Sequence, residues 1–288
     1  MRPCRVALSG SVGPGVCPVS RSTLPVAAAL LSCLAVPALA QERVSARYEI
    51  LIGGLQVGIA GFEGRVSQDS YQASVSLRLS GVSRIIASGR GSAMASGRIA
   101  GGRAVPANYT LTLATTQQND TIRMAMAGGS VRSHSAEPER PAAADQVPLT
   151  AGHRQGVLDP LSAGFFFVPG SGPTTVAEAC AKTFPVFDGR QRYDLSFSFA
   201  RTETLKVAGY EGPAVVCNAR YRAIAGHRPA VTAPMEANRD MQIWLAPVAG
   251  TRALVPARIA IRTPVGMAEI QPTRLELGAP ATTASVSR

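Results

Sequence analysis

The sequence predicts an all-β protein, and three observations lead to that fold class. Apolar and polar residues alternate strictly in many short segments, turn-forming residues separate these segments, and the segments recur at the spacing typical of sandwiches and barrels. Successive side chains of a strand point to opposite faces, so the alternation gives each strand one face for a core and one for water. We therefore expect a mostly β domain, built as a strongly curved antiparallel sheet of half-barrel or sandwich-like form, with one short helix near residues 160–167.

The predicted strands follow one another along the chain after residue 41. Residues 48–58 read as a strand, a Gly-Gly turn and a return strand, and residues 71–79 show the clearest alternation. The same pattern returns at residues 55–59, 109–113, 122–126, 193–199, 217–221, 241–245 and 259–261. Turn residues lie between the segments, for example at Gly53, Gly54, Asn119 and Asp120. We expect about nine to twelve strands, with consecutive strands paired as antiparallel neighbours.

The first forty residues are predicted to be a secretory signal peptide. An apolar run behind Arg21 is too short to cross a bilayer and ends in a small-x-small motif before Gln41. We expect cleavage after Ala40 and export from the cytoplasm. Lipidation at Cys33 is disfavoured, because the apolar run continues beyond it to Leu39.

The exported chain is predicted to form a single β-rich domain over residues 41–278. Asp159 followed by Pro160 has the form of a helix cap and a first helical residue, which places the short helix. Before it, residues 133–157 show no sustained period and read as a long loop. The expected plan is a signal peptide with a long N-terminal extension at 1–40, β-rich halves at 41–132 and 184–278, a joining loop and short helix at 133–183, and a disordered tail at 279–288.

Positive charge comes almost entirely from arginine. The 288 residues include 29 Lys and Arg against 18 Asp and Glu, for a formal net charge of +11. The arginines are scattered rather than gathered in a stripe, and an exported chain does not meet nucleic acid, so no nucleic-acid partner is expected. Anionic lipid headgroups or acidic envelope polymers are the candidate partners, unless the arginine content reflects only a GC-rich genome.

Two cysteines remain after the signal, Cys180 and Cys217. In an oxidising compartment such a pair predicts a disulfide. A Cys-x-x-Cys spacing and an adjacent activating base are both absent, so we expect a structural bond rather than a redox pair.

The sequence contains no recognisable catalytic or metal-binding constellation. The three histidines, His134, His153 and His227, are isolated from one another, which does not favour a metal site. Asp159 could serve as a general acid or base, but its place before a proline explains it as a cap, and Asp188 beside a glycine is explained as a turn residue. We expect no catalytic residue, no metal and no cofactor.

An aromatic cluster, Phe165, Phe166 and Phe167, is the most apolar group after the signal. These side chains could close an apolar cavity as a lid, or they could be plugs of the core. Trp244 alternates out of phase with Ile243 and Leu245, so it is expected on the opposite side of its strand, lining a rim or pocket or covering the disulfide-linked layer.

Several short motifs in order give the chain a family resemblance. They are Tyr48 to Gly58, Asp159-Pro160-Leu161-Ser162, Phe187-Asp188-Gly189, Cys217 to Tyr221, Ile243-Trp244-Leu245, Leu254-Val255-Pro256 and Thr263 to Gly266. Together they resemble the exported bacterial proteins of domain of unknown function family 3108, over nearly all of residues 44–277. The resemblance implies a periplasmic or envelope-facing β protein of Gram-negative bacteria, and no catalytic residue is carried across. A looser similarity of fold links it to periplasmic lipoprotein-carrier-like β proteins.

Three functional hypotheses follow. The leading one is a non-enzymatic periplasmic protein that binds a lipid, an acyl chain or a lipoprotein in maintenance of the cell envelope, with Phe165, Phe166, Phe167 and Trp244 as candidate ligand contacts. The alternative is an envelope-integrity scaffold that acts through contacts with envelope proteins and has no ligand cavity. A cryptic hydrolase comes third. An integral outer-membrane barrel is disfavoured, because aromatic residues make up only 5% of the chain and it ends in a polar tail.

Overall fold

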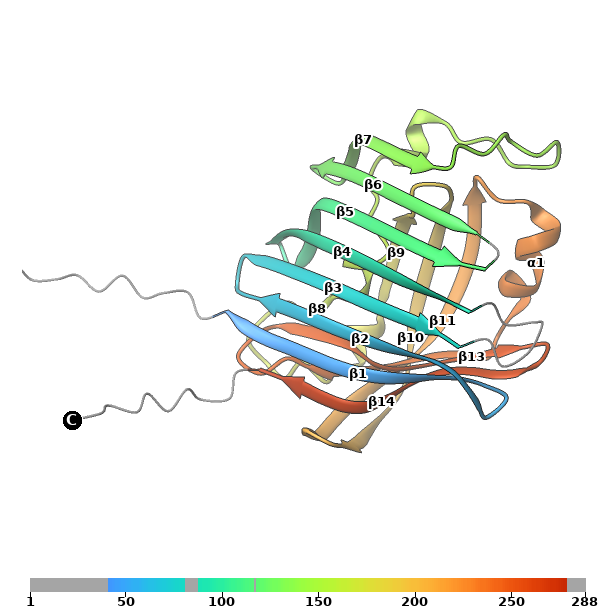
Figure 1. Ribbon diagram of the computed structural model, residues 1–288. Helices are drawn as coiled ribbons and strands as arrows, with labels where there is room; N and C mark the ends of the chain where they lie inside the picture. The colour runs from blue at the N-terminus through green and yellow to red at the C-terminus, as the bar shows by residue number, and fades with distance from the viewer. Residues whose placement is uncertain (1–40, 81–87, 117, 279–288) are drawn as a thin grey trace, which may run out of the picture. The chain divides into compact units, whose positions relative to one another are not determined.

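The computed structural model describes residues 41–80, 88–116 and 118–278. The predicted signal peptide, the cleavage site after Ala40, Cys33 and the tail at 279–288 lie outside the described residues. Within them the structure is mostly β, as predicted (Figure 1). The strands are β1 Glu42–Ile52, β2 Leu55–Val66, β3 Ser70–Leu79, β4 Gly89–Ala100, β5 Arg103–Thr115, β6 Asn119–Ala127, β7 Ser130–Glu137, β8 Phe166–Phe167, β9 Lys182–Phe187, β10 Arg192–Val207, β11 Tyr210–Ala225, β12 Met241–Pro247, β13 Ala253–Thr263 and β14 Gly266–Leu277.

All of these strands belong to one antiparallel sheet. Its order is β7-β6-β5-β4-β3-β2-β1-β14-β13-β12-β11-β10-β9, and the short β8 pairs with β13. The first and last long strands of the chain, β1 and β14, are therefore neighbours in the middle of the sheet. The sheet is not closed into a barrel, because β7 and β9 remain at its two edges.

The described residues form fourteen strands, more than the nine to twelve expected. β4 is the clearest omission, because its sequence is mostly Gly, Ala and Ser and its two large apolar residues, Met94 and Ile99, do not form an alternating pattern. Its small residues have a packing reason: a Cβ on Gly97 would lie 2.6 Å from the Tyr71 hydroxyl. The loop was predicted to begin at residue 133, but in the structure the strand β7 continues to Glu137, where it still pairs with β6.

The helix expected near residues 160–167 is a single 3-10 turn, Ser162–Gly164. The N-cap of this turn is Leu161 and not Asp159 as predicted, but Asp159 lies just before it and its Oδ1 accepts hydrogen bonds from the backbone N–H groups of Leu161 and Ser162 at 3.0 and 2.9 Å. Two further 3-10 turns lie at Ala151–Arg154 and Ala177–Cys180. The α-helix among the described residues, α1 Pro229–Ala237, was not predicted, because it is only nine residues long and has Pro234, a helix-breaking residue type, in its interior.

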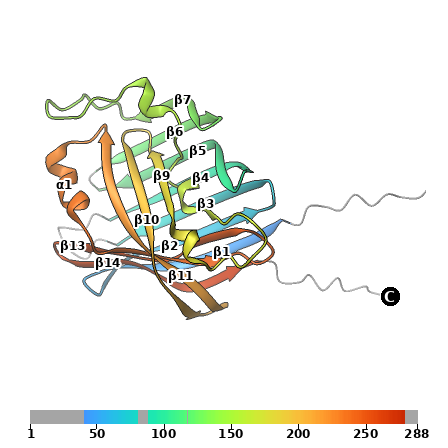
Figure 2. The same ribbon diagram turned by 180° about the vertical axis from the view of Figure 1, so that it is seen from behind.

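The two halves of the sheet share a core. One buried cluster joins Val44 of β1, Tyr71 of β3 and Leu275 of β14 to Phe165 and Phe167. A second cluster gathers Phe166, the two cysteines and residues of β11–β13, and a third joins β4–β6 to Phe187. Figures 1 and 2 show β3–β6 on one side of this interior and β9–β11 on the other. Residues 157–168 of the joining segment therefore pack inside the curved sheet.

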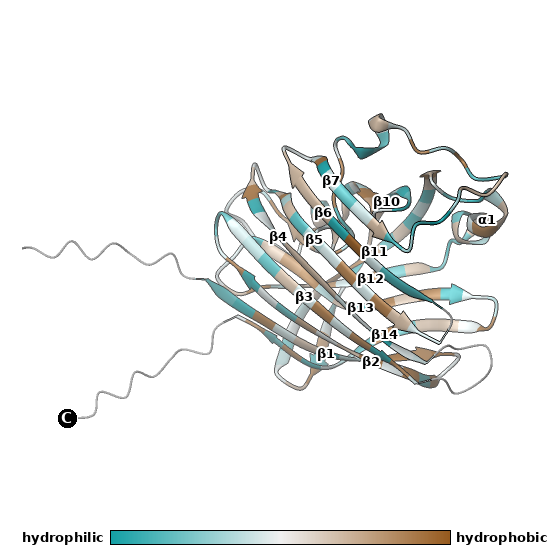
Figure 3. Ribbon diagram, turned by 45° about the horizontal axis from the view of Figure 1, so that its top comes forward, coloured by the Kyte–Doolittle hydropathy of each residue, from teal (hydrophilic) through white to brown (hydrophobic). Residues whose placement is uncertain are grey.

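Figure 3 shows hydrophobic and hydrophilic residues alternating along the strands, the pattern from which the fold was predicted. We call the side that packs on the clusters above the inner face, and the opposite side of β1–β6 the outer face. No helix among the described residues is long and apolar enough to cross a membrane.

Candidate functional site

An apolar cavity of about 290 Å³ lies on the inner face, where the two halves of the sheet meet. β1–β3 form one wall, β10, β12, β13 and β14 form the other, and residues 160–166 run between them. Its largest apolar lining residues are Tyr48, Phe62, Val75, Leu161, Phe165, Phe166, Leu195, Phe197, Ile243, Val255, Ile259 and Ile270. Several of them, including Leu195, Phe197 and Ile259, are only half-buried although they face the interior. The cavity wall is therefore apolar, and other residues of the protein cover it only in part.

The polar groups near this cavity are already engaged. Tyr48 donates a hydrogen bond from its hydroxyl to the Pro256 carbonyl oxygen at 2.8 Å, and burial raises the pKa of this hydroxyl. Arg258, the one charged residue in the described lining, forms an ion pair with Glu269 and stacks 4.7 Å from the centre of the Trp244 ring system. Such a site favours an apolar ligand over a charged one, because a buried charge would have no free partner.

The structure places the three phenylalanines in the interior. Phe165 and Phe166 line the cavity, while Phe167 packs in the cluster beside it. Their exposed fractions are 2%, 0% and 3%, so they act as walls and core rather than as a surface flap. Phe166 meets the rings of Phe184 and Phe197 edge-on, at centroid distances of 5.0 and 4.9 Å.

Trp244 lies away from the cavity, on the opposite side of β12 from Ile243 and Leu245, as its phase predicted. It packs with Val216 and Ala260, and its indole N–H donates to Glu203. Arg201 and Arg258 lie over its ring. The structure therefore does not bring Trp244 together with the three phenylalanines.

The predicted disulfide is present between Cys180 and Cys217. Both residues are fully buried and pack with Phe166 in the second core cluster. The bond attaches the 3-10 turn Ala177–Cys180 to β11, just behind the cavity wall.

Asp159, Ser162 and Tyr71 form a buried hydrogen-bond chain. The Ser162 hydroxyl lies 2.5 Å from Asp159 Oδ2 and 2.6 Å from the Tyr71 hydroxyl. None of the three side chains is exposed. Burial raises the pKa of the Asp159 carboxyl, against the lowering effect of its hydrogen bonds. Sequence patterns did not reveal this chain of hydrogen bonds, because Tyr71 is far from Asp159 and Ser162 in the sequence.

Replacing Asp159 with asparagine is expected to alter the dependence of stability on pH. The pKa of Asp159 is raised in the folded state, so its favourable contribution is complete below the ordinary value of 3.8 and is lost as pH rises through the folded pKa. The substituted amide cannot ionise but keeps the carbonyl acceptor, so urea unfolding from pH 3.8 upward should show a flatter profile for the variant. The control is Asp240→Asn, at an exposed ion pair with Arg262. Identical profiles for Asp159→Asn and the unaltered protein would contradict this assignment.

Asp188 is a turn residue, as predicted. Its Oδ1 accepts hydrogen bonds from the N–H groups of Arg190 and Gln191 at 2.8 and 2.6 Å. Gly189 supplies a φ of +98°, which a residue with a side chain rarely adopts. Burial raises the pKa of Asp188, against its hydrogen bonds to the backbone.

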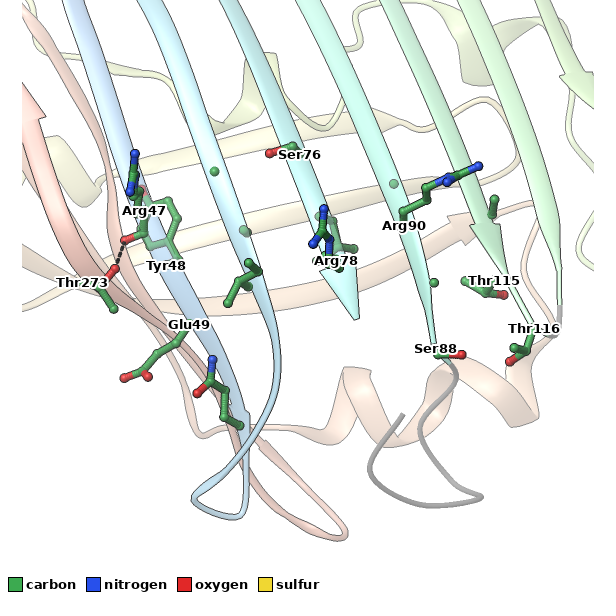
Figure 4. A pocket seen from close by; sticks show the side chains of 18 residues that line it. Arg47, Tyr48, Glu49, Ser76, Arg78, Ser88, Arg90, Thr115, Thr116 and Thr273 are labelled. Carbon is green, nitrogen blue, oxygen red and sulfur yellow. Dashed lines mark hydrogen bonds between the residues drawn. The ribbon is translucent and has the colours of Figure 1, made fainter. Parts of the chain in front are cut away.

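A second hollow, of about 1070 Å³, lies on the outer face over β1–β5 (Figure 4). Arg47 of β1, Arg78 of β3 and Arg90 of β4 line it with the hydroxyls of Ser76, Ser88 and Thr116. Glu49 is its one acidic lining residue in the described chain. This groove is positively charged, and sequence reasoning missed it because its arginines are far apart in the chain.

The described residues contain no group of three or more His, Cys, Asp or Glu side chains placed to hold a metal ion.

The fold and the two hollows define a class: an open, mostly β protein whose curved sheet encloses an apolar cavity. The chain belongs to the family described as protein of unknown function, DUF3108, whose model matches residues 47–271. Its structure is similar to the crystal structure of a β-barrel-like protein of domain of unknown function DUF1849 from Brucella abortus, with a TM-score of 0.49 and 9% identity, over 82% of this chain and 98% of that one. No curated protein matches the sequence.

Proposed function

We propose that this protein binds an apolar or amphipathic molecule of the cell envelope, such as the acyl chain of a lipid or lipoprotein, and does so without catalysis. The observation that carries the proposal is the inner cavity, because it is apolar, lies between both halves of the sheet and is walled by half-buried side chains. The site of action that goes with it is the periplasm, to which the predicted signal peptide would direct the chain.

The size and chemistry of the cavity support an acyl chain. Its volume of about 290 Å³ is near the lower end of the range for small-molecule sites. A water-sized group occupies about 30 Å³, so the cavity has room for on the order of ten methylene groups. Each methylene that leaves water contributes about 0.8 kcal/mol, which makes a linear chain a ligand of useful affinity.

The buried phenylalanines are unsuitable positions for a test substitution. Phe166 has no exposed surface, so an Asp in its place would bury a charge and destabilise the fold. The proposal is therefore better tested at a position whose side chain is small and faces the cavity. Ala60 of β2 meets this need, because it lines the cavity and lies between Tyr48 and Leu77 in the sheet register.

Filling the cavity with Ala60→Phe is expected to abolish ligand binding. Protein purified from cells without detergent should carry a lipid-sized adduct in native mass spectrometry, and the variant should lack it. The added ring would cost about 1–3 kcal/mol of stability through overpacking, so circular dichroism must confirm that the variant is folded.

The matched control is Ala125→Phe, which places the same side chain at an exposed position of β6. It should keep the adduct. A clean apo mass for the unaltered protein, together with no binding of added palmitate, would refute the proposal and favour a scaffold without a ligand. A folded Ala60→Phe variant that retains the adduct would place the ligand elsewhere.

A further inference from the structure

The outer face carries arginines in direct cross-strand register. Arg78 of β3 lies opposite Arg90 of β4, and Arg43 of β1 lies opposite Arg65 of β2. Arg47 of β1 lies opposite Arg274 of β14. Like charges placed directly opposite each other destabilise a sheet, so three such pairs on one face oppose folding.

The protein supplies few counterions for this face. Arg274 pairs with Glu276, but Arg43, Arg47, Arg65, Arg78 and Arg90 form no ion pair with any described carboxylate. All 18 Asp and Glu residues lie in the described chain, because residues 1–40, 81–87, 117 and 279–288 contain none. The five guanidinium groups are exposed and available to an anion from outside the molecule.

Exposed apolar side chains accompany these arginines. Ile59, which is 49% exposed, lies next to Arg78 in the register, and Met94, which is 61% exposed, stands on the same face. Leu55 and Val265 are 68% and 61% exposed. They lie at the β1–β2 and β13–β14 turns, which are joined by a hydrogen bond from the Gly53 N–H to the Met267 carbonyl. Four of the seven exposed large apolar residues in the described chain therefore lie on this face or at its edge.

From this combination we infer that the outer face of β1–β4 docks on the surface of a membrane that contains anionic phospholipids. Arginine pairs match the phosphate groups of lipid headgroups, since a guanidinium can bind phosphate through two parallel hydrogen bonds. The exposed apolar side chains at the same surface would enter the boundary between headgroups and acyl chains. A soluble polyanion would use the arginines but gain nothing from Ile59, Leu55 and Val265. This inference does not depend on a ligand in the inner cavity, which opens on the other side of the sheet.

Vesicle sedimentation tests the inference with the whole purified protein. The unaltered protein is expected to bind vesicles of phosphatidylcholine mixed with phosphatidylglycerol, and not vesicles of phosphatidylcholine alone. Arg78→Gln combined with Arg90→Gln should weaken binding by about tenfold or more, because each arginine near an anionic surface contributes to the attraction. The same variant should unfold at an equal or higher urea concentration, because it removes a repulsive pair.

The control is Arg132→Gln combined with Arg222→Gln, which removes the same charge from exposed positions on β7 and β11. It should bind nearly as well as the unaltered protein, and an equal loss in both variants would overturn the inference. A second variant, Ile59→Ser with Leu55→Ser, should weaken vesicle binding and leave the fold intact. Binding to soluble polyphosphate but not to anionic vesicles would assign the face to a polymer and also overturn the inference.

Discussion

Loss of the Cys180–Cys217 bond is expected to lower the free energy of unfolding by about 3–4 kcal/mol. The bond closes a loop of 37 residues that contains β9, β10 and the first half of β11. Without it, the unfolded chain regains the conformational freedom that the closed loop removes. The change should appear as a lower midpoint in urea unfolding of a variant with alanine at both positions.

Alanine is preferred to serine in this experiment, because both sites are fully buried and a hydroxyl there would lack a partner. The unaltered protein with its bond reduced should unfold at nearly the same midpoint as the double variant. Equal stability of the oxidised and reduced forms would contradict the prediction. Mass mapping of the oxidised protein without reductant should recover the two cysteines in one cross-linked peptide pair.

Asp120→Asn is expected to cost about 3 kcal/mol, because it breaks the ion-pair cluster beside the open edges of the sheet. The Asp120 side chain is 8% exposed and accepts hydrogen bonds from Arg140 at 2.7 and 2.8 Å and from Arg190 at 2.9 Å. Arg190 comes from the turn between β9 and β10, whereas Asp120 is the second residue of β6. The cluster thus connects two regions of the sheet that backbone pairing does not join.

The neutral amide of this variant would leave Arg190, whose side chain is 21% exposed, without its charged partner. Urea unfolding measures the loss, and hydrogen exchange should show faster exchange of the amides in β7 and β9. The control is Asp145→Asn, which removes the carboxylate of an exposed pair with Arg228 and should change stability little. Equal effects of the two substitutions would show that the cluster does not hold the edges together.

Local sequence patterns predicted much of the fold because they report on single strands. The alternation at residues 71–79 is the alternation of inner and outer residues in β3, and the phase of Trp244 placed it on the side of β12 away from Ile243. The turn at Asp188 and Gly189 was likewise readable, because it depends on neighbouring residues alone. β4 escaped prediction because a strand of small residues has no clear hydrophobic period.

The candidate sites were only partly predictable, because each is assembled from distant segments. The sequence singled out Phe165 and Phe166 as apolar, but it did not show that the cavity they line is completed by β1–β3 and β10–β14. Nor did it show that Arg78 and Arg90 are paired, since that depends on the register of β3 against β4. Asp120 was predicted to be a turn residue, but it lies in β6. Its ion pair with Arg190 forms only because the fold brings the turn before β10 beside β6.

The sequence by itself therefore determined the mostly β class, the inner and outer faces of its clearest strands, the turns at Gly53-Gly54 and Asp188-Gly189, and the pairing of the two cysteines after the predicted signal. These features depend on residue spacing and local backbone geometry, and each of the two cysteines has only the other to pair with. Only the tertiary structure decided that β1 pairs with β14, that the sheet stays open between β7 and β9, and that Phe165 to Phe167 are interior walls. The physical reason is that strand pairing and burial are set by contacts between segments far apart in the chain, which a local pattern does not encode.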